Sequence, residues 1–293
     1  MLNDALYNTD EVINLLQVKR IDVDRYLGNS HFKGNPRTFG GQILGQGLHA
    51  AAHTVDHRRP VSLHAMFISP GDAHLSIEYQ VDRVRDGGSF SSRRVVAFQG
   101  SREICHISLS FQEEEDGISH HQLNTSVAIP ERMQPHSPHW RHHPNGGTST
   151  IFPAPVDFRC EDADCFGTPF THVPHQKIWA RTPNRMPHAR LTHETLLTYI
   201  SDYGLIWTAL KQHGIAPYDV DLQAASLDHT IWFHRPFRLD DWLLFSMASP
   251  NASGGRGLNI AHVYDHQGGM VATVAQEGLI RLNRPQQGVK PSQ

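Results

Sequence analysis

The chain of 293 residues is 39% hydrophobic and 19% charged, and its 26 Lys and Arg against 29 Asp and Glu give a formal net charge of −3. This near-balance gives no reason to expect nucleic acid or an anionic membrane as a partner, and no apolar stretch approaches the ~18–20 residues that span a bilayer. The N-terminal stretch is acidic where a secretory signal is basic. We therefore expect a globular protein of the cytoplasm, long enough for one large domain or two ordinary ones.

The first half of the chain predicts one buried helix followed by four strands. Residues 39–55 combine apolar side chains at the spacing of one helix face with an internal glycine, Gly47. Such a glycine costs about 1 kcal/mol relative to alanine, which is tolerated where a neighbour must lie close, so we expect a sheet to wrap this helix. A preliminary strand is predicted at 18–25, and alternating residues between turn signals predict strands at 62–69, 75–84, 89–99 and 104–113.

The second half repeats this order. A strand at 176–181 precedes a helix at 192–212, and strands follow at 222–234, 242–249, 257–265 and 270–282. The turns between strands are too short for parallel crossovers, so the pattern predicts an α+β fold with antiparallel sheets. Two copies of a helix followed by four strands form a repeat at the scale of a domain.

The stretch between the two copies predicts a boundary. It is rich in Glu, His, Pro, Ser and Gly, and a structureless loop of this length inside one compact domain is uncommon. We therefore expect an N-terminal domain at 1–116, an inter-domain linker at 117–155 and a C-terminal domain at 156–293.

Four longer motifs occur in the order and spacing of a known family. They are Phe39-Gly-Gly-Gln-Ile-Leu-Gly-Gln, Phe67-Ile-Ser-Pro-Gly-Asp72, Arg85-Asp-Gly-Gly-Ser-Phe-Ser-Ser-Arg-Arg-Val95 and Asp228-His-Thr-Ile-Trp-Phe-His-Arg-Pro-Phe237. From about residue 15 to 283 the chain thereby resembles the type II acyl-CoA thioesterases, which include bacterial thioesterase II and a peroxisomal acyl-CoA thioesterase. The resemblance implies a double hotdog: two tandem repeats, each an antiparallel sheet wrapped around a central helix, with one edge-to-edge pairing of hotdog sheets inside the chain.

The resemblance also implies a catalytic set. In this family an Asp on the second central helix, a Thr or Ser on the next strand and a Gln on the final strand jointly orient the attacking water. Matched by motif, these are Asp202 in Tyr199-Ile-Ser-Asp-Tyr203, Ser226 in Ala224-Ala-Ser-Leu-Asp228 and Gln276 in Thr273-Val-Ala-Gln-Glu-Gly278. Bacterial members carry Thr in place of Ser226, so this chain keeps the hydroxyl and loses the methyl group.

Each of the three residues also has an ordinary structural interpretation. Asp202 interrupts an apolar helical run, where an unpaired carboxylate is costly to bury, but it could instead face solvent. Gln276 lies on an otherwise apolar strand face and could be an amide that closes a sheet edge. Ser226 could be an ordinary strand serine. Pattern-breaking polar residues on three elements of one half nevertheless favour a shared pocket.

Hydrolysis of a thioester needs a nucleophile, an acceptor for its proton and donors for the developing oxyanion. Asp202 would accept the proton of a water that Ser226 and Gln276 position, with a pKa raised by burial. No Gly-x-Ser-x-Gly motif surrounds Ser226, so we expect direct attack by water and no acyl-enzyme. Backbone N–H groups at Gly40 and Gly41 could serve the oxyanion.

We expect neither a metal nor another cofactor. His136-x-x-His139-x-x-His142-His143 has a spacing that could bind a divalent ion, but the segment is Pro-rich and irregular, which favours a solvated, pH-sensitive linker. Arginines on the predicted strands could contact CoA phosphates, although scattered strand arginines are more often solvated; they are Arg83, Arg85, Arg93 and Arg94.

The expected activity is hydrolysis of fatty acyl-CoA to free fatty acid and CoA, with acyl-CoA as the partner and no nucleic acid or membrane partner. Two alternatives stay open: a non-catalytic acyl-CoA-binding hotdog protein and an enoyl-CoA hydratase. Hydratase chemistry needs an Asp/His pair near the central helix, whereas Asp228-His229 lies on a predicted strand. The family also implies a homo-oligomer and a role in fatty acid metabolism.

Overall fold

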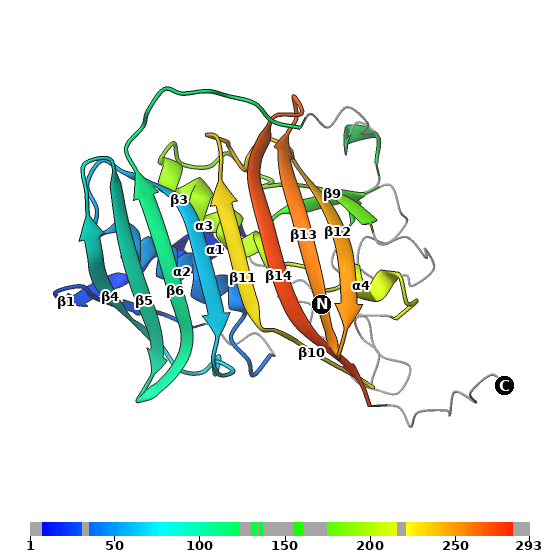
Figure 1. The fold of residues 1–293 in the computed structure, drawn as a ribbon, viewed down its shortest axis with the longest axis horizontal. Helices are drawn as coiled ribbons and strands as arrows, with labels where there is room; N and C mark the ends of the chain where they lie inside the picture. The colour runs from blue at the N-terminus through cyan, green and yellow to red at the C-terminus, as the bar shows by residue number, and fades with distance from the viewer. Residues whose placement is uncertain are drawn as a thin grey trace.

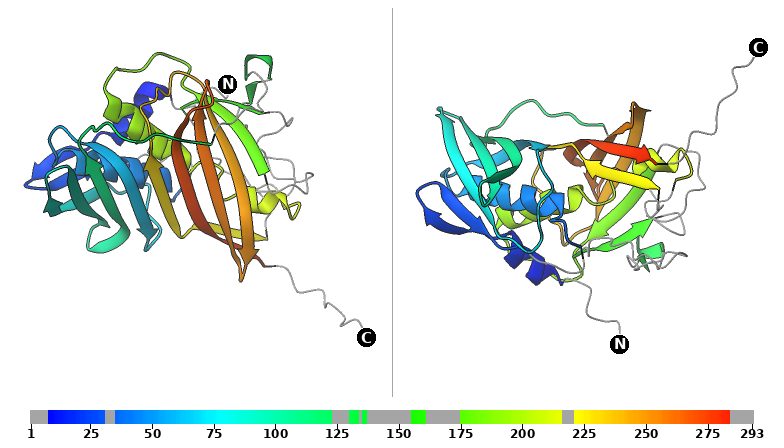
Figure 2. Two further views of the ribbon diagram at one scale, coloured as in Figure 1. Left: turned by 45° about the horizontal axis from the view of Figure 1, so that its top comes forward. Right: turned by 90° about the horizontal axis from the view of Figure 1, so that it is seen from below.

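The computed structural model describes residues 8–30, 35–122, 130–133, 135–136, 155–160, 175–215 and 221–283. Its strands form one broad curved sheet, and the main helices lie behind that sheet in the view of Figure 1. Seen from below in Figure 2, the sheet curls around the helices. Within the described ranges, no helix is long and apolar enough to cross a membrane.

The first half contains the predicted helix and four strands. Helix α2 spans Gly40–Ala52. The strands are β3 (Arg59–Phe67), β4 (Ile77–Asp86), β5 (Phe90–Gln99) and β6 (Arg102–Gln112). The predicted preliminary strand is a short hairpin of β1 (Lys19–Asp22) and β2 (Arg25–Gly28).

Helix α1 (Thr9–Leu16) was not among the expected elements. Its N-cap is Asn8, whose side chain accepts a hydrogen bond from the Glu11 backbone N–H at 2.8 Å. Asn8 and Glu11 stand at the spacing of a helix-capping signal, so this helix could have been predicted from the sequence.

The second half follows the same order. A 3₁₀ helix at Pro130–Arg132 and strand β7 (Pro135–His136) come first, followed by β8 (Asp157–Cys160) and β9 (His175–Arg181). The helices are α3 (Arg190–Ser201) and α4 (Thr208–Lys211). The strands are β10 (Leu222–Ser226), β11 (Asp228–Phe233), β12 (Leu243–Ser253), β13 (Arg256–Asp265) and β14 (Met270–Leu282).

The single helix predicted at 192–212 is wrong, because the structure divides it into α3 and α4. Asp202 is the C-cap of α3, and Gly204 adopts a φ of +76° just beyond it. That left-handed conformation suits glycine and stops helix propagation. Asp202 therefore stands at the end of the helix, just before the chain changes direction at Gly204.

The strand predicted at 222–234 is likewise two strands. The Leu227 backbone N–H donates to Glu277 O at 3.0 Å, and Leu227 O accepts from the Phe67 N–H at 3.0 Å. At this residue the chain passes from β10, which pairs only with β14, to β11, which lies between β3 and β14. Ser226 is consequently the last residue of its strand.

All the strands described belong to one antiparallel sheet with the order β1-β2-β4-β5-β6-β3-β11-β14-β13-β12-β9-β8-β7, and β10 pairs with β14 beside this path. The two halves meet where β3 pairs with β11, with Leu63 opposite Ile231. Figure 1 shows this junction near the middle of the sheet. The edge-to-edge pairing expected within the chain is confirmed.

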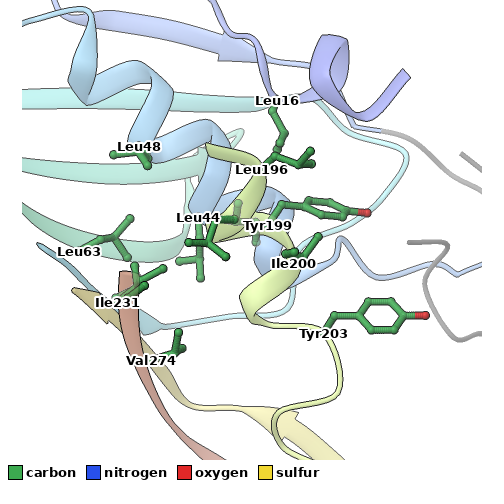
Figure 3. Close-up of a cluster of buried hydrophobic side chains, with 14 of the residues drawn as sticks. Leu16, Leu44, Leu48, Leu63, Leu196, Tyr199, Ile200, Tyr203, Ile231 and Val274 are labelled. Atoms are coloured by element: carbon green, nitrogen blue, oxygen red, sulfur yellow. The ribbon is translucent and has the colours of Figure 1, made fainter. Parts of the chain in front are cut away.

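Small residues bring the two central helices together in the concavity of the sheet. A Cβ on Gly41 would overlap the Tyr199 carbonyl oxygen, and one on Gly45 would lie 3.1 Å from Thr195 O, so α3 rests on the glycine face of α2. Gly47 lies against Ile107 of β6, which confirms the close neighbour predicted for it. Apolar side chains from both helices and from β3, β11 and β14 converge below this contact in Figure 3.

Part of the predicted linker packs on the second half. The Trp242 indole Nε1 donates to Glu131 Oε1 at 2.7 Å, and β7 pairs with β8. Most of residues 117–155 lies outside the described residues, and the division at 1–116, 117–155 and 156–293 stays a prediction.

Candidate active site

The carboxylate of Asp202 meets the N-terminus of the other central helix. Asp202 is buried, and its Oδ2 accepts a hydrogen bond from the Gly41 backbone N–H at 2.9 Å. Unpaired N–H groups and the helix dipole at such a terminus favour a negative charge. The approach requires a glycine before Gly41, because a Cβ on Gly40 would lie 2.6 Å from Asp202 Oδ2.

The other two predicted residues bind the second oxygen of the same carboxylate. The Ser226 hydroxyl donates to Asp202 Oδ1 at 3.3 Å, and Gln276 Nε2 donates both to Asp202 Oδ1 and, at 3.0 Å, to Ser226 Oγ. Gln276 is 0% exposed and lies on β14 between β11 and β13. The structure therefore brings the three residues together. Asp202 does not face solvent, and Gln276 does not lie at a sheet edge.

Burial and hydrogen bonding act in opposite directions on the acidity of Asp202. Loss of solvation raises the pKa of this carboxyl group to about 6, although the hydrogen bonds from Gln276, Gly41 and Ser226 each lower it. Desolvation dominates because it disfavours the charged form more than three donors stabilise that form. The result is a carboxylate that is ionised near neutral pH yet is a stronger base than an exposed Asp.

A cavity of about 370 Å³ adjoins this cluster, and Gly40, Asp202 and Ser226 line it. Gln276 lies behind the wall and meets the cavity only through its hydrogen bonds to the other two residues. Several lining residues are apolar, among them Phe39, Ile43 and Ile206, which are buried. The exposed Arg37 also lines the cavity, and sequence reasoning missed it.

Three of the four arginines considered for CoA have other partners. Arg83 pairs with Asp24 at 2.9 Å and Arg94 with Asp82 at 2.6 Å. Arg93 is buried and donates to Asp86, to Thr54 and to backbone carbonyls. Arg85 is exposed, and none of these four arginines is among the residues that line the cavity.

Two further expectations change in the structure. The Gly41 N–H proposed for the oxyanion is bonded to Asp202 instead. His229 does lie on a strand, but its Nδ1 is 4.0 Å from Asp202 Oδ1, so an Asp/His pair exists at the end of α3. Spacing in the sequence gave no signal for this pair, because the strand passes under the helix end only in the folded chain.

The structure does not test the histidine cluster for metal binding. His139, His142 and His143 lie outside the described residues, and only the backbone of His136 lies within them. Within the described ranges, no group of three or more His, Cys, Asp or Glu side chains could hold a metal ion.

A sheet made of two halves joined edge to edge, curved around two central helices, defines a double-hotdog protein, here with a carboxylate, a hydroxyl and an amide beside a cavity. A protein with a hot dog fold from Alicyclobacillus acidocaldarius superimposes with a TM-score of 0.74 at 16% identity, over 94% of this chain and 98% of that one. This likeness shows the fold. The α+β double hotdog predicted from the sequence is confirmed.

Comparisons with known proteins then identify the family. The acyl-CoA thioesterase model matches residues 157–279, and the acyl-CoA thioesterase N-terminal domain model matches residues 30–112. Acyl-CoA thioesterase 2 of Haemophilus influenzae is 34% identical over 96% of this chain and 100% of its own length. Acyl-CoA thioesterase II TesB2 from Mycobacterium marinum has a TM-score of 0.78 at 34% identity, over 94% of this chain and 99% of that one. The chain belongs to the acyl-CoA thioesterase family and is a thioester hydrolase.

Proposed function

We propose that this enzyme hydrolyses fatty acyl-CoA to a free fatty acid and CoA by direct attack of a water that Asp202 activates, with Ser226 and Gln276 holding the carboxylate. The observation that carries the proposal is the Asp202 carboxylate itself. It lines the cavity, it accepts hydrogen bonds from three donors, and burial raises its pKa to about 6. A general base works best when its pKa is near the working pH.

The reaction balances without a further reagent. The water oxygen forms a bond to the thioester carbonyl carbon, and one water proton passes to Asp202. The carbon–sulfur bond then breaks, and Asp202 returns the proton to the departing CoA sulfur. Ser226 already donates to the carboxylate and accepts from Gln276. These bonds suit a hydroxyl that orients the base, and Ser226 stands in no Gly-x-Ser-x-Gly motif that would favour an acyl-enzyme.

A thiol-release assay on acyl-CoAs from short to long chains tests the proposal. We expect turnover by the wild-type enzyme, and a loss of about 10²- to 10⁴-fold in Asp202→Asn, the range typical of removing a general base. Ser226→Ala and Gln276→Ala should lose less, because each removes only one donor to the carboxylate. A trapped acyl group on Ser226 would contradict direct water attack.

The same preparation separates the alternatives. Binding of acyl-CoA with no thiol release by the wild-type protein would favour the non-catalytic binder. Loss of enoyl-CoA absorbance without thiol release would favour the hydratase, for which the proximity of Asp202 and His229 is the supporting observation.

The cavity also suggests how the substrate lies. The acyl chain would occupy the part lined by Phe39 and Ile206, and the CoA phosphates would meet Arg37 at the exposed end. In Arg37→Ala, we expect kcat/KM for acyl-CoA to fall roughly 10-fold or more, the equivalent of one charge-assisted hydrogen bond. Hydrolysis of an acyl-pantetheine, which has no phosphate, should not change. Arg94→Ala, which removes an arginine outside the cavity, is the matched control, and equal losses on both substrates would refute this assignment.

We further assign the reaction to the cytoplasm and to fatty acid metabolism, and we expect a homo-oligomer, on the basis of the family resemblance. Light scattering coupled to size-exclusion chromatography measures the assembly directly. A single species at the chain mass of 33.0 kDa would contradict the oligomer.

A further inference from the structure

The hydrogen bonds of Ser201 determine which nitrogen of His229 carries a proton. Ser201 Oγ lies 2.9 Å from the Thr198 carbonyl oxygen and 2.9 Å from His229 Nε2. A hydroxyl has one proton, and the carbonyl can only accept, so the Ser201 hydroxyl donates to Thr198 O and accepts from His229. His229 therefore carries a proton on Nε2.

The other ring nitrogen faces the candidate base. His229 is 0% exposed, burial lowers its pKa to about 3, and the ring is consequently neutral with a lone pair on Nδ1. Nδ1 lies 4.0 Å from Asp202 Oδ1 and has no hydrogen-bond partner among the described residues. A buried acceptor without a donor is costly, which suggests that a donor reaches it in another state of the site.

The surrounding groups leave Asp202 as that donor. From β6, Cys105 contributes a buried thiol that keeps its proton because burial raises its pKa, but this thiol already donates to the His106 carbonyl oxygen at 3.7 Å. On β11 itself, Asp228 is held by the Glu277 backbone N–H at 2.8 Å. From α2, the Gly41 N–H is bonded to Asp202 Oδ2.

We propose that His229 is a positioning residue for the base: its Nδ1 lone pair accepts a hydrogen bond from Asp202 when the carboxyl group has taken the proton of the attacking water. This inference rests on the proposed function. In the resting enzyme the lone pair faces an ionised oxygen, which disfavours the carboxylate. After proton transfer, an Oδ1–H···Nδ1 bond stabilises the acid. Both effects raise the basicity of Asp202.

The geometry and the proton balance fit this role. Closing the 4.0 Å gap to hydrogen-bond distance takes about 1 Å, and catalytic hydrogen bonds are often long before substrate binds. The proton moves from water to Asp202 and from Asp202 to the CoA sulfur. His229 keeps its Nε2 proton, and hence its bond to Ser201, throughout.

Two amide substitutions distinguish the role of Nδ1 of His229 from that of Nε2. In His229→Gln the amide nitrogen can reach the place of Nε2 and donate to Ser201, but no acceptor remains at the place of Nδ1. In His229→Asn the amide oxygen can occupy the place of Nδ1, but the donor to Ser201 is lost. The ring volume is reduced in both, so each serves as the control for the other.

We expect His229→Gln to lower kcat about 10- to 100-fold with KM nearly unchanged, and to move the acid limb of the kcat profile down by about half a pH unit or more. His229→Asn should keep kcat within several-fold and leave the limb in place. If His229 serves only to hold Ser201, His229→Asn should lose more activity than His229→Gln, and the pH profile of kcat should move in neither variant. That result would overturn the inference.

A spectroscopic measurement on the wild-type enzyme covers the case in which neither variant folds. With ¹⁵N-labelled histidine, one buried ring should show a protonated Nε2 and an unprotonated Nδ1, and the Nδ1 resonance should respond to pH with a midpoint near that of Asp202. This response should vanish in Asp202→Asn. A protonated Nδ1 would refute the inference. The measurements also distinguish failure of this inference from failure of the proposed function. Activity retained in Asp202→Asn refutes the proposed function. An inactive Asp202→Asn beside a fully active His229→Gln refutes only the role of His229.

Discussion

Replacing the proposed base should make the protein more stable while it abolishes activity. The pKa of Asp202 is about 6 in the folded chain against 3.8 for an ordinary Asp. This difference of about 2 pH units corresponds to about 3 kcal/mol at 1.36 kcal/mol per unit. A folded-state pKa above the unfolded value means that the ionised carboxylate destabilises the fold. That cost is fully present above the folded pKa and disappears as the pH falls below 4.

Asp202→Asn removes the charge and keeps the shape. The Asn oxygen can still accept from Gly41, but its NH₂ group faces the donors Gln276 and Ser226, so we allow roughly 1–2 kcal/mol for donors left without an acceptor. The variant should therefore gain about 1–2 kcal/mol at pH 8. For a protein of this size that is a rise in Tm of roughly 2–8 °C.

Thermal unfolding at pH 8 and pH 4.5, together with thiol release at pH 8, measures both effects. The Tm difference between variant and wild type should be largest at pH 8 and should shrink at pH 4.5, where the wild-type carboxyl is protonated. Asp82→Asn, which removes an exposed carboxylate paired with Arg94, is the control and should change neither Tm nor turnover appreciably. An Asp202→Asn variant that unfolds several degrees below the wild type at pH 8 would refute the calculation and indicate a structural carboxylate.

Three other outcomes are expected. The rate kcat/KM should fall tenfold per pH unit below a midpoint near 6, because Asp202 must be ionised to accept a proton; a midpoint near 4 would exclude this carboxyl as the base. Gly40→Ala should lower turnover at least tenfold, because its Cβ would lie 2.6 Å from Asp202 Oδ2, whereas Gly88→Ala, with nothing within 4 Å, should be neutral. Arg93→Met should lower stability by about 3 kcal/mol in denaturant unfolding by leaving buried acceptors unpaired, while Arg94→Met should cost under about 0.5 kcal/mol; equal effects would show that burial does not distinguish the two arginines.

The helix α2 shows how much of the fold was predictable. Its apolar face and its glycines are read from a short stretch of sequence, and the close neighbour predicted for Gly47 is observed, with further close contacts at Gly41 and Gly45. The antiparallel strands follow from alternation and turn residues, which are also local. The helix predicted through Asp202 failed for a local reason as well, since Gly204 in a left-handed conformation ends the helical path there.

The sequence predicted the three residues of the candidate site and a shared pocket for them, but not the contacts by which they meet. Their types and motifs indicated a carboxylate, a hydroxyl and an amide, but each also had an ordinary interpretation. The structure adds contacts between distant parts of the chain, which a local sequence pattern does not indicate. Gln276 lies behind the cavity wall, and His229 faces Asp202. The strand arginines are the opposite case: the sequence made them candidates for CoA contact, and the structure pairs three of them with carboxylates. The spacing of these residues in the sequence did not indicate their partners Asp24, Asp82 and Asp86.

By itself, the sequence determined which faces of the helices and strands are buried, because hydrophobic periodicity and turn residues act over a few neighbouring positions. Only the tertiary structure decided the environment of Asp202. Its hydrogen-bond partners Gly41, Gln276 and Ser226 stand 161, 74 and 24 positions away in the chain. A pKa depends on the solvent and charge within a few ångströms of a group, and for this carboxylate both are set by the docking of α2 onto α3 and by the sheet that curves around them.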